Sequence, residues 1–271
     1  MRRLERLLIA WISIAGLLLA TGCNRLTFIK PNLDKVKIEQ VRQPVVARDS
    51  PVVKARMAAQ QQVVQASGAL QDGNPAEAER LVRAALKADP ASVDAHTVMA
   101  ALNERLGRSA EAGDWFKKAA EMSGGRSREV GNYAAWMCGS GRAGESLAVF
   151  DYALQGAQDE SSRAGILANA GACSVQAGMD ERANGYLRQA IRLDPENALA
   201  LEKLAGLAEK QGQWMEARAF TERRLALPAV DAQTLRAAVR IETRLGDARA
   251  AAQYQQRLQN EFPAAATKTG N

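Results

Sequence analysis

Histidine, cysteine and aromatic side chains are scarce in this chain, and their scarcity narrows the chemistry open to it. One histidine and three cysteines occur in 271 residues, and aromatic residues make up 5% of the composition. No group of His, Cys and Asp has the spacing of a metal site, and the acids lie at helical intervals with Arg and Lys, as on solvated faces. The single histidine, His96, is interpreted as a packing or surface residue. We therefore predict that the chain is not an enzyme and needs no cofactor or metal.

Long β-forming runs are also lacking after residue 60, which favours an all-helical fold. The net charge of +6 is unevenly distributed. Residues 1–22 carry three Arg and one Glu, residues 24–56 carry eight Lys or Arg against three Asp or Glu, and the rest is close to neutral. A protein that binds nucleic acid would concentrate positive charge on its folded face. The charge distribution therefore argues against nucleic acid as a partner.

The N-terminus has the features of a bacterial lipoprotein signal peptide. A basic start precedes an apolar run over residues 7–19, which is too short for a comfortable membrane-spanning helix. The run ends in LATGC (19–23), which resembles a lipobox and predicts a signal peptide over residues 1–22 and a lipid on Cys23. No Asp follows this cysteine, so the sorting rule of such lipoproteins predicts the periplasmic face of the outer membrane. The alternatives are an ordinary signal peptide and an uncleaved anchor.

The segment after the signal peptide is interpreted as a flexible tether. Residues 23–56 contain three prolines and no sustained helical period, which indicates a basic spacer of roughly thirty residues. Such a spacer either favours anionic lipid beside the anchor or is simply solvated. Residues 57–263 are expected to form the folded part, and residues 264–271 a disordered tail.

Glycines recur at a nearly constant spacing through the folded part. The successive intervals are 34, 34, 37, 34 and 34 residues, between Gly73, Gly107, Gly141, Gly178, Gly212 and Gly246. This is the period of the tetratricopeptide repeat (TPR), in which each unit is a pair of helices. Small residues stand seven before and five after most of these glycines, where two helices must cross closely. Larger apolar residues stand nine after the first four glycines: Val82, Phe116, Phe150 and Leu187.

Each helix pair has an apolar face that it cannot bury alone, so the pairs stack. We predict an all-α fold, a right-handed superhelical solenoid of about six TPR helix pairs. The 37-residue interval is interpreted as a longer loop near residues 159–163. Departures from the repeat consensus at Thr221, Arg224 and Gln255 are interpreted as positions where a terminal repeat meets water.

Residues 139–146 (GSGRAGES) raise nucleotide binding as an alternative, because they match G-x-G-x-x-G and nearly match a P-loop. A phosphate loop follows a strand and opens a helix within a βαβ unit. Here Gly141 is the third of six equivalent turn glycines, and Glu145 stands where a P-loop has Lys. We therefore predict a turn between two helices and no bound nucleotide.

Cys138 and Cys173 are left as a pair if Cys23 carries lipid. Both fall late in the first helix of adjacent repeats, and such helices stack side by side, so the two thiols are able to meet in an oxidising compartment. A disulfide is one interpretation. The other is two separate buried thiols that behave as small apolar residues.

Asn132 and Asn169 each lie nine residues before a turn glycine, so they hold the same position in the third and fourth repeats. First helices line the concave surface of TPR proteins, and this column resembles the asparagine ladder by which some of them hold extended peptides. An Asn amide both donates and accepts hydrogen bonds. The alternative is that both amides cap or bond inside the solenoid. Lys203 holds the same place in the fifth repeat. The sixth repeat carries a basic stripe of Arg236, Arg240 and Arg244. It is interpreted either as a surface for an acidic partner or as a solvated face.

The chain as a whole resembles the PilF/PilW lipoproteins of type IV pilus biogenesis. The likeness rests on NYAAWMCGSGR (132–142) and LANAGACSVQAG (167–178), together with the lipobox, the tether and the six repeats. The two stretches are similar to the N-Y-x-x-F/W-x-C-x-x-G-R and N-A-G-x-C motifs of that family. Trp136, where Phe or another bulky apolar residue is expected, and Ala20 in the lipobox are modest departures.

The resemblance implies a pilotin, a lipoprotein that binds the pilus secretin in a TPR groove and promotes its localisation and multimerisation in the outer membrane. It implies that Tyr133 and Trp136 contribute to partner binding with Asn132, Asn169 and Lys203. The alternative is a generic periplasmic TPR scaffold, an adaptor for outer-membrane protein assembly or for cell-wall machinery.

Overall fold

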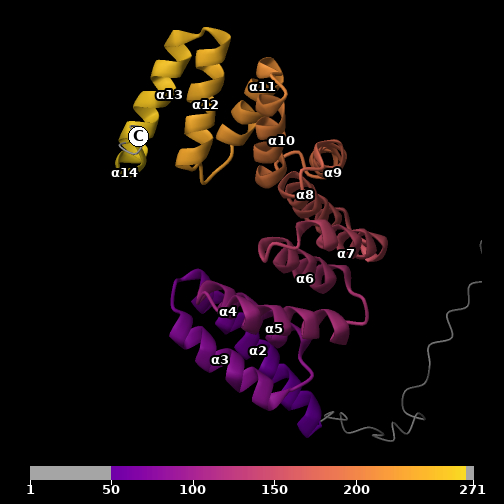
Figure 1. Ribbon diagram of the computed structural model, residues 1–271. Helices are drawn as coiled ribbons and strands as arrows, with labels where there is room; N and C mark the ends of the chain where they lie inside the picture. The colour runs from indigo at the N-terminus through magenta and orange to yellow at the C-terminus, as the bar shows by residue number, and fades with distance from the viewer. Residues whose placement is uncertain (1–49, 267–271) are drawn as a thin grey trace, which may run out of the picture. The chain divides into compact units, whose positions relative to one another are not determined.

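The computed structural model describes residues 50–266, and every regular element in this range is a helix (Figure 1). Cys23, most of the predicted tether and residues 267–271 lie outside the described residues. Within the described range, no helix is both long and apolar enough to cross a membrane. The helices are α2 (Pro51–Gln71), α3 (Pro75–Ala88), α4 (Val93–Arg105), α5 (Ser109–Met122), α6 (Ser127–Gly139), α7 (Ala143–Gly156), α8 (Glu160–Gln176), α9 (Asp180–Leu193), α10 (Ala198–Lys210), α11 (Trp214–Leu225), α12 (Ala232–Leu245), α13 (Ala248–Glu261) and α14 (Pro263–Ala266).

Consecutive helices between residues 51 and 261 form six pairs, from α2 and α3 to α12 and α13, and each pair packs on the next (Figure 1). All six repeat glycines lie between the two helices of a pair and have a left-handed backbone, with φ from 71° to 87°. At Gly141 the N–H donates to the Cys138 carbonyl, and the next N–H, of Arg142, donates to the Met137 carbonyl. These bonds close the end of the first helix. The predicted all-α solenoid of TPR helix pairs is confirmed.

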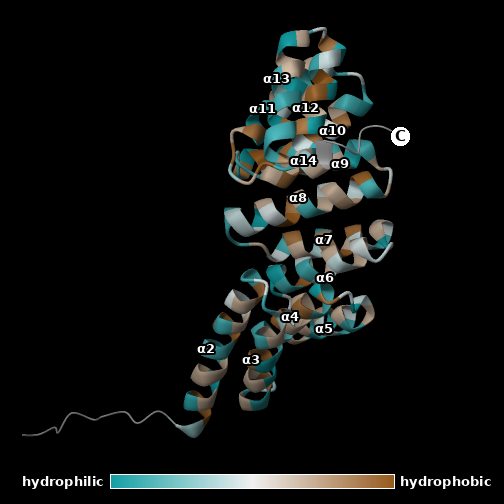
Figure 2. Ribbon diagram, turned by 90° about the vertical axis from the view of Figure 1, so that its left-hand side faces the viewer, coloured by the Kyte–Doolittle hydropathy of each residue, from teal (hydrophilic) through white to brown (hydrophobic). Residues whose placement is uncertain are grey.

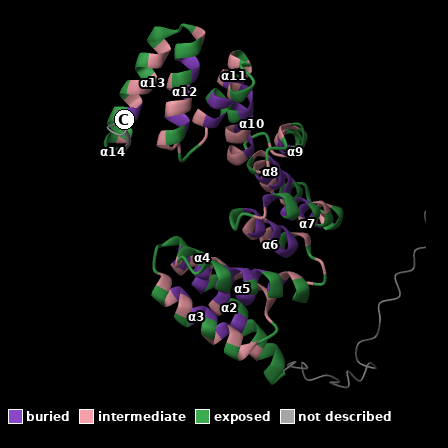
Figure 3. Ribbon diagram, viewed as in Figure 1, coloured by how far each residue is buried: buried purple, intermediate pink, exposed green. Residues whose placement is uncertain are grey.

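Small residues make the close helix crossings of the core. Ala66, Ala100 and Ala134, each seven residues before a turn glycine, are completely buried. The fourth repeat has Gly171 at this position, where a Cβ atom would lie 2.5 Å from the Leu187 Cγ, so the larger Leu187 leaves room only for glycine. Buried residues lie on the helix sides that face other helices (Figure 3), and hydrophobic and hydrophilic residues alternate along each helix (Figure 2).

The 37-residue interval is taken up by a longer helix, so the predicted longer loop is wrong. Helix α8 has 17 residues, against 13 in α6 and in α10. The carboxylate of Asp159 accepts a hydrogen bond from the Ser162 N–H at 2.7 Å, and Glu160 follows in the first turn. A capping acid and a second acid near the positive end of the helix dipole stabilise a helix start here. The inserted residues therefore lengthen α8 at its N-terminus.

The folded part is longer at both ends than predicted. Helix α2 begins at Pro51, inside the stretch interpreted as tether, and the Ser50 side chain accepts a hydrogen bond from the Val53 N–H at 3.3 Å. Proline suits the first helical position because its missing N–H would have no helical partner there. At the other end, the short helix α14 (Pro263–Ala266) extends three residues into the stretch 264–271 predicted as a disordered tail.

Candidate partner-binding groove

One position recurs on the first helix of every pair, nine residues before the turn glycine. We call these residues the inner column: Val64, Val98, Asn132, Asn169, Lys203 and Ala237. Val64 and Val98 line a groove beside α2 and α4, and Lys203 and Ala237 line a second pocket beside α10 and α12. Equivalent positions therefore border hollows at both ends of the series, as expected for a column on the accessible face of the first helices.

Asn132 on α6 and Asn169 on α8 are half-buried, and neither side chain makes a hydrogen bond to any described residue. A third asparagine shows the contrasting arrangement. Asn103 on α4 is buried and donates from Nδ2 to the Met99 carbonyl at 2.8 Å. The alternative that the two column amides cap or bond inside the solenoid therefore has no support among the described residues. Both keep donors and acceptors available to an external peptide.

A disulfide joins the two helices that carry these amides. Cys138 on α6 and Cys173 on α8 are bonded, with their Cα atoms 5.8 Å apart, and both side chains are buried. The Gln176 side chain adds a second link, from Nε2 to the Cys138 carbonyl at 3.3 Å. Asn132 and Asn169 lie on the same two helices, so the cross-link limits how far the two amides move apart.

Tyr133 and Trp136 make packing contacts that the two asparagines lack. The Trp136 Nε1 donates to the Ser109 carbonyl at 2.9 Å, and its ring stacks on Tyr133 with centroids 5.9 Å apart. The indole lies against Gly113 of α5, in the preceding pair. Arg142 adds a cation–π contact at 5.2 Å. These contacts give both aromatic side chains a packing role between the second and third pairs.

The groove beside α2 and α4 combines apolar and ionic side chains. Val64 is 67% exposed there, and Val98 is half-buried. Arg128 reaches the same groove from α6 and pairs with Asp94 at 2.7 Å and with the buried Glu129 at 2.9 Å. The hydrogen bond to Glu129 is the largest cause of a raised Arg128 pKa, so the guanidinium stays charged at every physiological pH.

His96 is a packing residue, one of the two roles predicted for it. Its ring is 1% exposed, its Nδ1 lies 2.8 Å from the Ser92 carbonyl, and its centroid is 5.3 Å from that of Trp115. Among residues 50–266, no group of three or more His, Cys, Asp or Glu side chains is placed to hold a metal ion.

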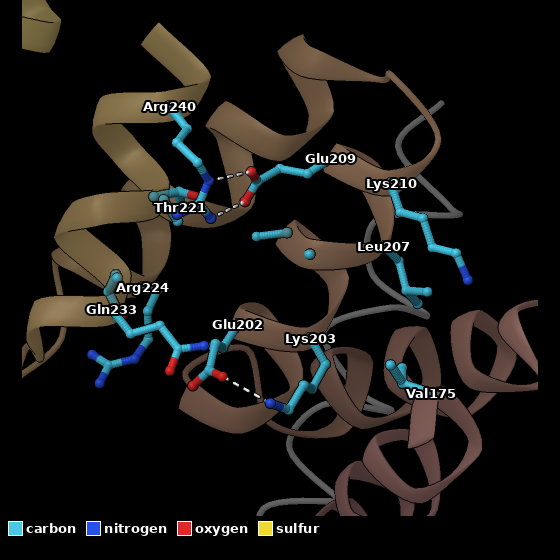
Figure 4. Close-up of a pocket in the computed structure, with 14 residues that line it drawn as sticks. Val175, Glu202, Lys203, Leu207, Glu209, Lys210, Thr221, Arg224, Gln233 and Arg240 are labelled. Atoms are coloured by element: carbon cyan, nitrogen blue, oxygen red, sulfur yellow. Dashed lines mark hydrogen bonds and ion pairs between the residues drawn. The ribbon is translucent and has the colours of Figure 1, made fainter. Parts of the chain in front are cut away.

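Lys203 lines a pocket of about 260 Å³ whose walls are α10 and α12 and whose floor includes α11 (Figure 4). Its ammonium pairs with Glu202 at 2.8 Å, and across the pocket Arg240 pairs with Glu209 at 3.2 Å. Arg240 belongs to the predicted basic stripe, as does Arg244, which lies over the Trp214 ring at 5.6 Å. Both side chains remain exposed, so the solvated face stays a valid interpretation of the stripe, with part of its charge paired.

Two departures from the repeat consensus have a different cause from the predicted one. Thr221 and Arg224 were expected at water, yet they are only 3% and 7% exposed and lie in the floor of this pocket. The sequence did carry a signal. The positions nine and twelve residues after the turn glycine hold apolar or small residues in the first four repeats. In the fifth repeat both positions are polar, with Thr221 and Arg224. Gln255, the third departure, is half-buried.

Family models for the tetratricopeptide repeat match residues 63–127 and residues 186–219. The two matches fall on helix pairs of the same architecture as the unmatched ones between them. The chain therefore contains tetratricopeptide repeats, and the described residues form a solenoid of such helix pairs.

The chain is homologous to a pilus assembly protein. It is 25% identical over 198 residues to the type IV pilus assembly protein PilF of Pseudomonas aeruginosa, a match that covers 72% of this chain and 77% of that protein. The crystal structure of PilW, a widely conserved type IV pilus biogenesis factor, is similar with a TM-score of 0.67 and 26% identity, over 76% of this chain and 94% of that one. Pseudomonas aeruginosa PilF has the same fold, with a TM-score of 0.68 and 24% identity over 78% and 94% of the two chains.

Proposed function

We propose that this chain is an outer-membrane lipoprotein of type IV pilus biogenesis, which binds the pilus secretin along its first helices and promotes secretin localisation and multimerisation. Homology to PilF and likeness to PilW support the assignment to the pilus. One observation carries the binding role. Asn132 and Asn169 are equivalent, partly exposed and without a hydrogen-bond partner among the described residues, on two helices that a disulfide joins.

The two amides suit an extended partner segment. Each carboxamide donates to a backbone carbonyl and accepts from a backbone N–H, so the pair binds main chain with little regard to sequence. Selectivity then comes from the hollows at either end of the inner column, one with both apolar and ionic side chains at Val64 and Val98, the other charged at Lys203. A lipid on Cys23 would hold this binding surface at the membrane and raise the local concentration of bound secretin subunits.

The role at the membrane is tested with a deletion strain and with Cys23→Ser. Membranes are fractionated, and the secretin is run on a gel that preserves heat-stable multimers. In the deletion strain we expect multimers to be lost or to move to the inner membrane while the monomer persists. In Cys23→Ser we expect displaced multimers and an unchanged melting curve of the repeats. Normal secretin multimers in both strains would instead favour a general scaffold. So would broad envelope defects in which pili are no more affected than other envelope structures.

The double variant Asn132→Ala, Asn169→Ala is expected to weaken secretin binding. Each lost amide removes hydrogen bonds worth about 1 kcal/mol net, so the two together should raise Kd roughly thirtyfold. The measurement is titration of the full mature chain with purified secretin.

Asn184→Ala is the matched control for this double variant. Its side chain lies on α9, the second helix of the fourth pair and therefore outside the inner column. There its only hydrogen bond to a described residue is one accepted from Arg188 at 2.8 Å. We expect binding of the control to match that of the unsubstituted chain. If the control and the double variant bound with equal affinity, and circular dichroism showed both to be folded, the two amides would not be part of the binding surface.

A further inference from the structure

The pocket between α10 and α12 owes its polar floor to two substitutions in the repeat pattern. At the position of Thr221, nine residues after the turn glycine, the first four repeats have Val82, Phe116, Phe150 and Leu187. At the position of Arg224, twelve residues after it, they have Ala85, Ala119, Ala153 and Ala190. All eight of these residues are buried core. The fifth repeat thus places a hydroxyl and a guanidinium where its neighbours place core side chains.

These polar groups are buried without adequate partners. Arg224 donates from Nη2 to the Ala229 carbonyl at 2.9 Å, but its Nε and Nη1 are buried and make no hydrogen bond. The Oγ1 atoms of Thr221 and of Thr234, from α12, are also buried and unbonded. The carboxylate paired with Arg224 is that of Asp231, 3.7 Å away and half exposed. Two guanidinium donors and two hydroxyls in one pocket are therefore left unsatisfied by the described residues.

Such groups point to an external acceptor. An unsatisfied buried donor costs free energy, and native structures leave few of them without protein, water or ligand partners. A guanidinium has donors only, and it matches a carboxylate in both charge and geometry. Threonine hydroxyls are able to donate to the same oxygens. The missing partner is thus best supplied by a carboxylate.

The size and charge of the pocket indicate the kind of molecule that carries this carboxylate. A volume of about 260 Å³ is just below the usual range of about 300–1,000 Å³ for small-molecule and cofactor sites. It is sufficient for a side chain or a chain end. Four cationic residues and two acidic ones line the pocket. Three of the cations have a carboxylate within 2.5 to 3.2 Å, whereas the nearest carboxylate to Arg224 is 3.7 Å away, so its guanidinium is the group left for an acidic occupant. The cations are Lys203, Lys210, Arg224 and Arg240, and the acids are Glu202 and Glu209.

We propose that this pocket binds a carboxylate of the partner polypeptide, held by the Arg224 guanidinium and by the hydroxyls of Thr221 and Thr234. The inference rests on the proposed function, because it places the occupant on the same partner that the asparagines hold. The carboxylate belongs to an Asp or Glu side chain or to the chain terminus. Gln233 lines the pocket (Figure 4), is exposed and makes no hydrogen bond to a described residue, so it is free to move and uncover the guanidinium.

The binding test uses three small probes and the full mature chain. N-acetyl-glutamate N-methylamide presents a side-chain carboxylate alone, N-acetyl-alanine a terminal carboxylate alone, and N-acetyl-glutamine N-methylamide no carboxylate. The readout is the Arg Nε–Hε region of the ¹⁵N NMR spectrum, in which Arg224→Met identifies the Arg224 signal. We expect this signal to move saturably with one or both carboxylates and not with the neutral probe. The carboxylate probe that binds more tightly shows whether the partner supplies a side-chain or a terminal carboxylate.

Two substitutions make the binding result decisive. Arg224→Met should abolish carboxylate-induced shifts of neighbouring pocket signals. Arg244→Met, on the basic stripe of α12 but outside the pocket, should leave them unchanged. Equal shifts with the neutral probe, no shift with either carboxylate, or equal effects of the two variants would each overturn the proposal. The probes include no secretin, so failure here leaves the result for the asparagines standing.

A second measurement separates a ligand-binding hydroxyl from a structural one. Thr234→Val keeps the shape of the side chain and removes an unbonded buried hydroxyl, so the empty protein should melt about 2–4 °C higher while its carboxylate binding weakens. Thr243→Val on the same helix is the control. Its hydroxyl donates to the Val239 carbonyl at 2.7 Å, so its loss should bring no such gain. A lower melting temperature for Thr234→Val would assign that hydroxyl a structural role and contradict the proposal.

Discussion

Replacing both Cys138 and Cys173 with alanine should lower the free energy of unfolding by about 3–4 kcal/mol, because the bond closes a loop of 35 residues and restricts the unfolded chain. The cost should appear as a lower urea midpoint for the full chain under oxidising conditions. Alanine avoids burying new hydroxyl groups at two positions that are only 5% exposed. Among the substitutions considered, this pair has the largest expected effect on stability.

Reduction of the unsubstituted protein provides the matched control. A thiol reductant should bring its urea midpoint close to that of the double alanine variant, and it should leave the variant itself unchanged. Mass spectrometry of the non-reduced protein should show one peptide pair joined through Cys138 and Cys173. An unsubstituted chain whose unfolding does not respond to reductant would show that the two side chains act as separate buried thiols.

Gly113→Ala should be the next most damaging substitution, at about 2–3 kcal/mol, the range typical of an overpacked core. A Cβ at this position would lie 2.0 Å from the Trp136 Cζ2, so the indole would have to move. That movement would break its hydrogen bond to the Ser109 carbonyl and its stacking on Tyr133. Urea unfolding followed by tryptophan fluorescence measures both the loss of stability and the displaced ring.

Gly165→Ala is the control for that experiment. Gly165 also lies within a helix, α8, but a Cβ there would meet no atom within 4 Å. Alanine should therefore be neutral, or stabilising by up to about 1 kcal/mol through helix propensity. If Gly113→Ala were as stable as Gly165→Ala, the packing role of Trp136 would be wrong.

Most of the fold could be predicted from the sequence because the turn glycines mark where the first helix of each pair ends. Only glycine readily adopts the left-handed backbone found at Gly73 and at its five equivalents, so the intervals between them fix where helix pairs begin and end. The same intervals do not say which element absorbs an insertion. The extra residues before Gly178 lengthen α8 because Asp159 caps it, and that capping depends on local geometry that the repeat period does not contain.

The candidate site was predictable where it depended on repeat position and not where it depended on packing between pairs. Asn132 and Asn169 could be identified as one column from spacing alone. Trp136 lies four residues after Asn132 on the same helix, yet its indole reaches Gly113 in the preceding pair, and no pattern within one repeat predicts that contact. Thr221 and Arg224 were visible as departures from the consensus, but their burial follows from how α10, α11 and α12 meet.

The composition of the inner column has a consequence for any extended chain that lies along it. A groove built from identical repeats would let such a chain slide by one unit, because each step would restore the same contacts. Here the column changes from Val64 and Val98, through the two asparagines, to Lys203. A slip of one repeat would set a partner's apolar group against an amide, or its main chain against an ammonium. An extended chain bound along this column would therefore take a single register and a single direction.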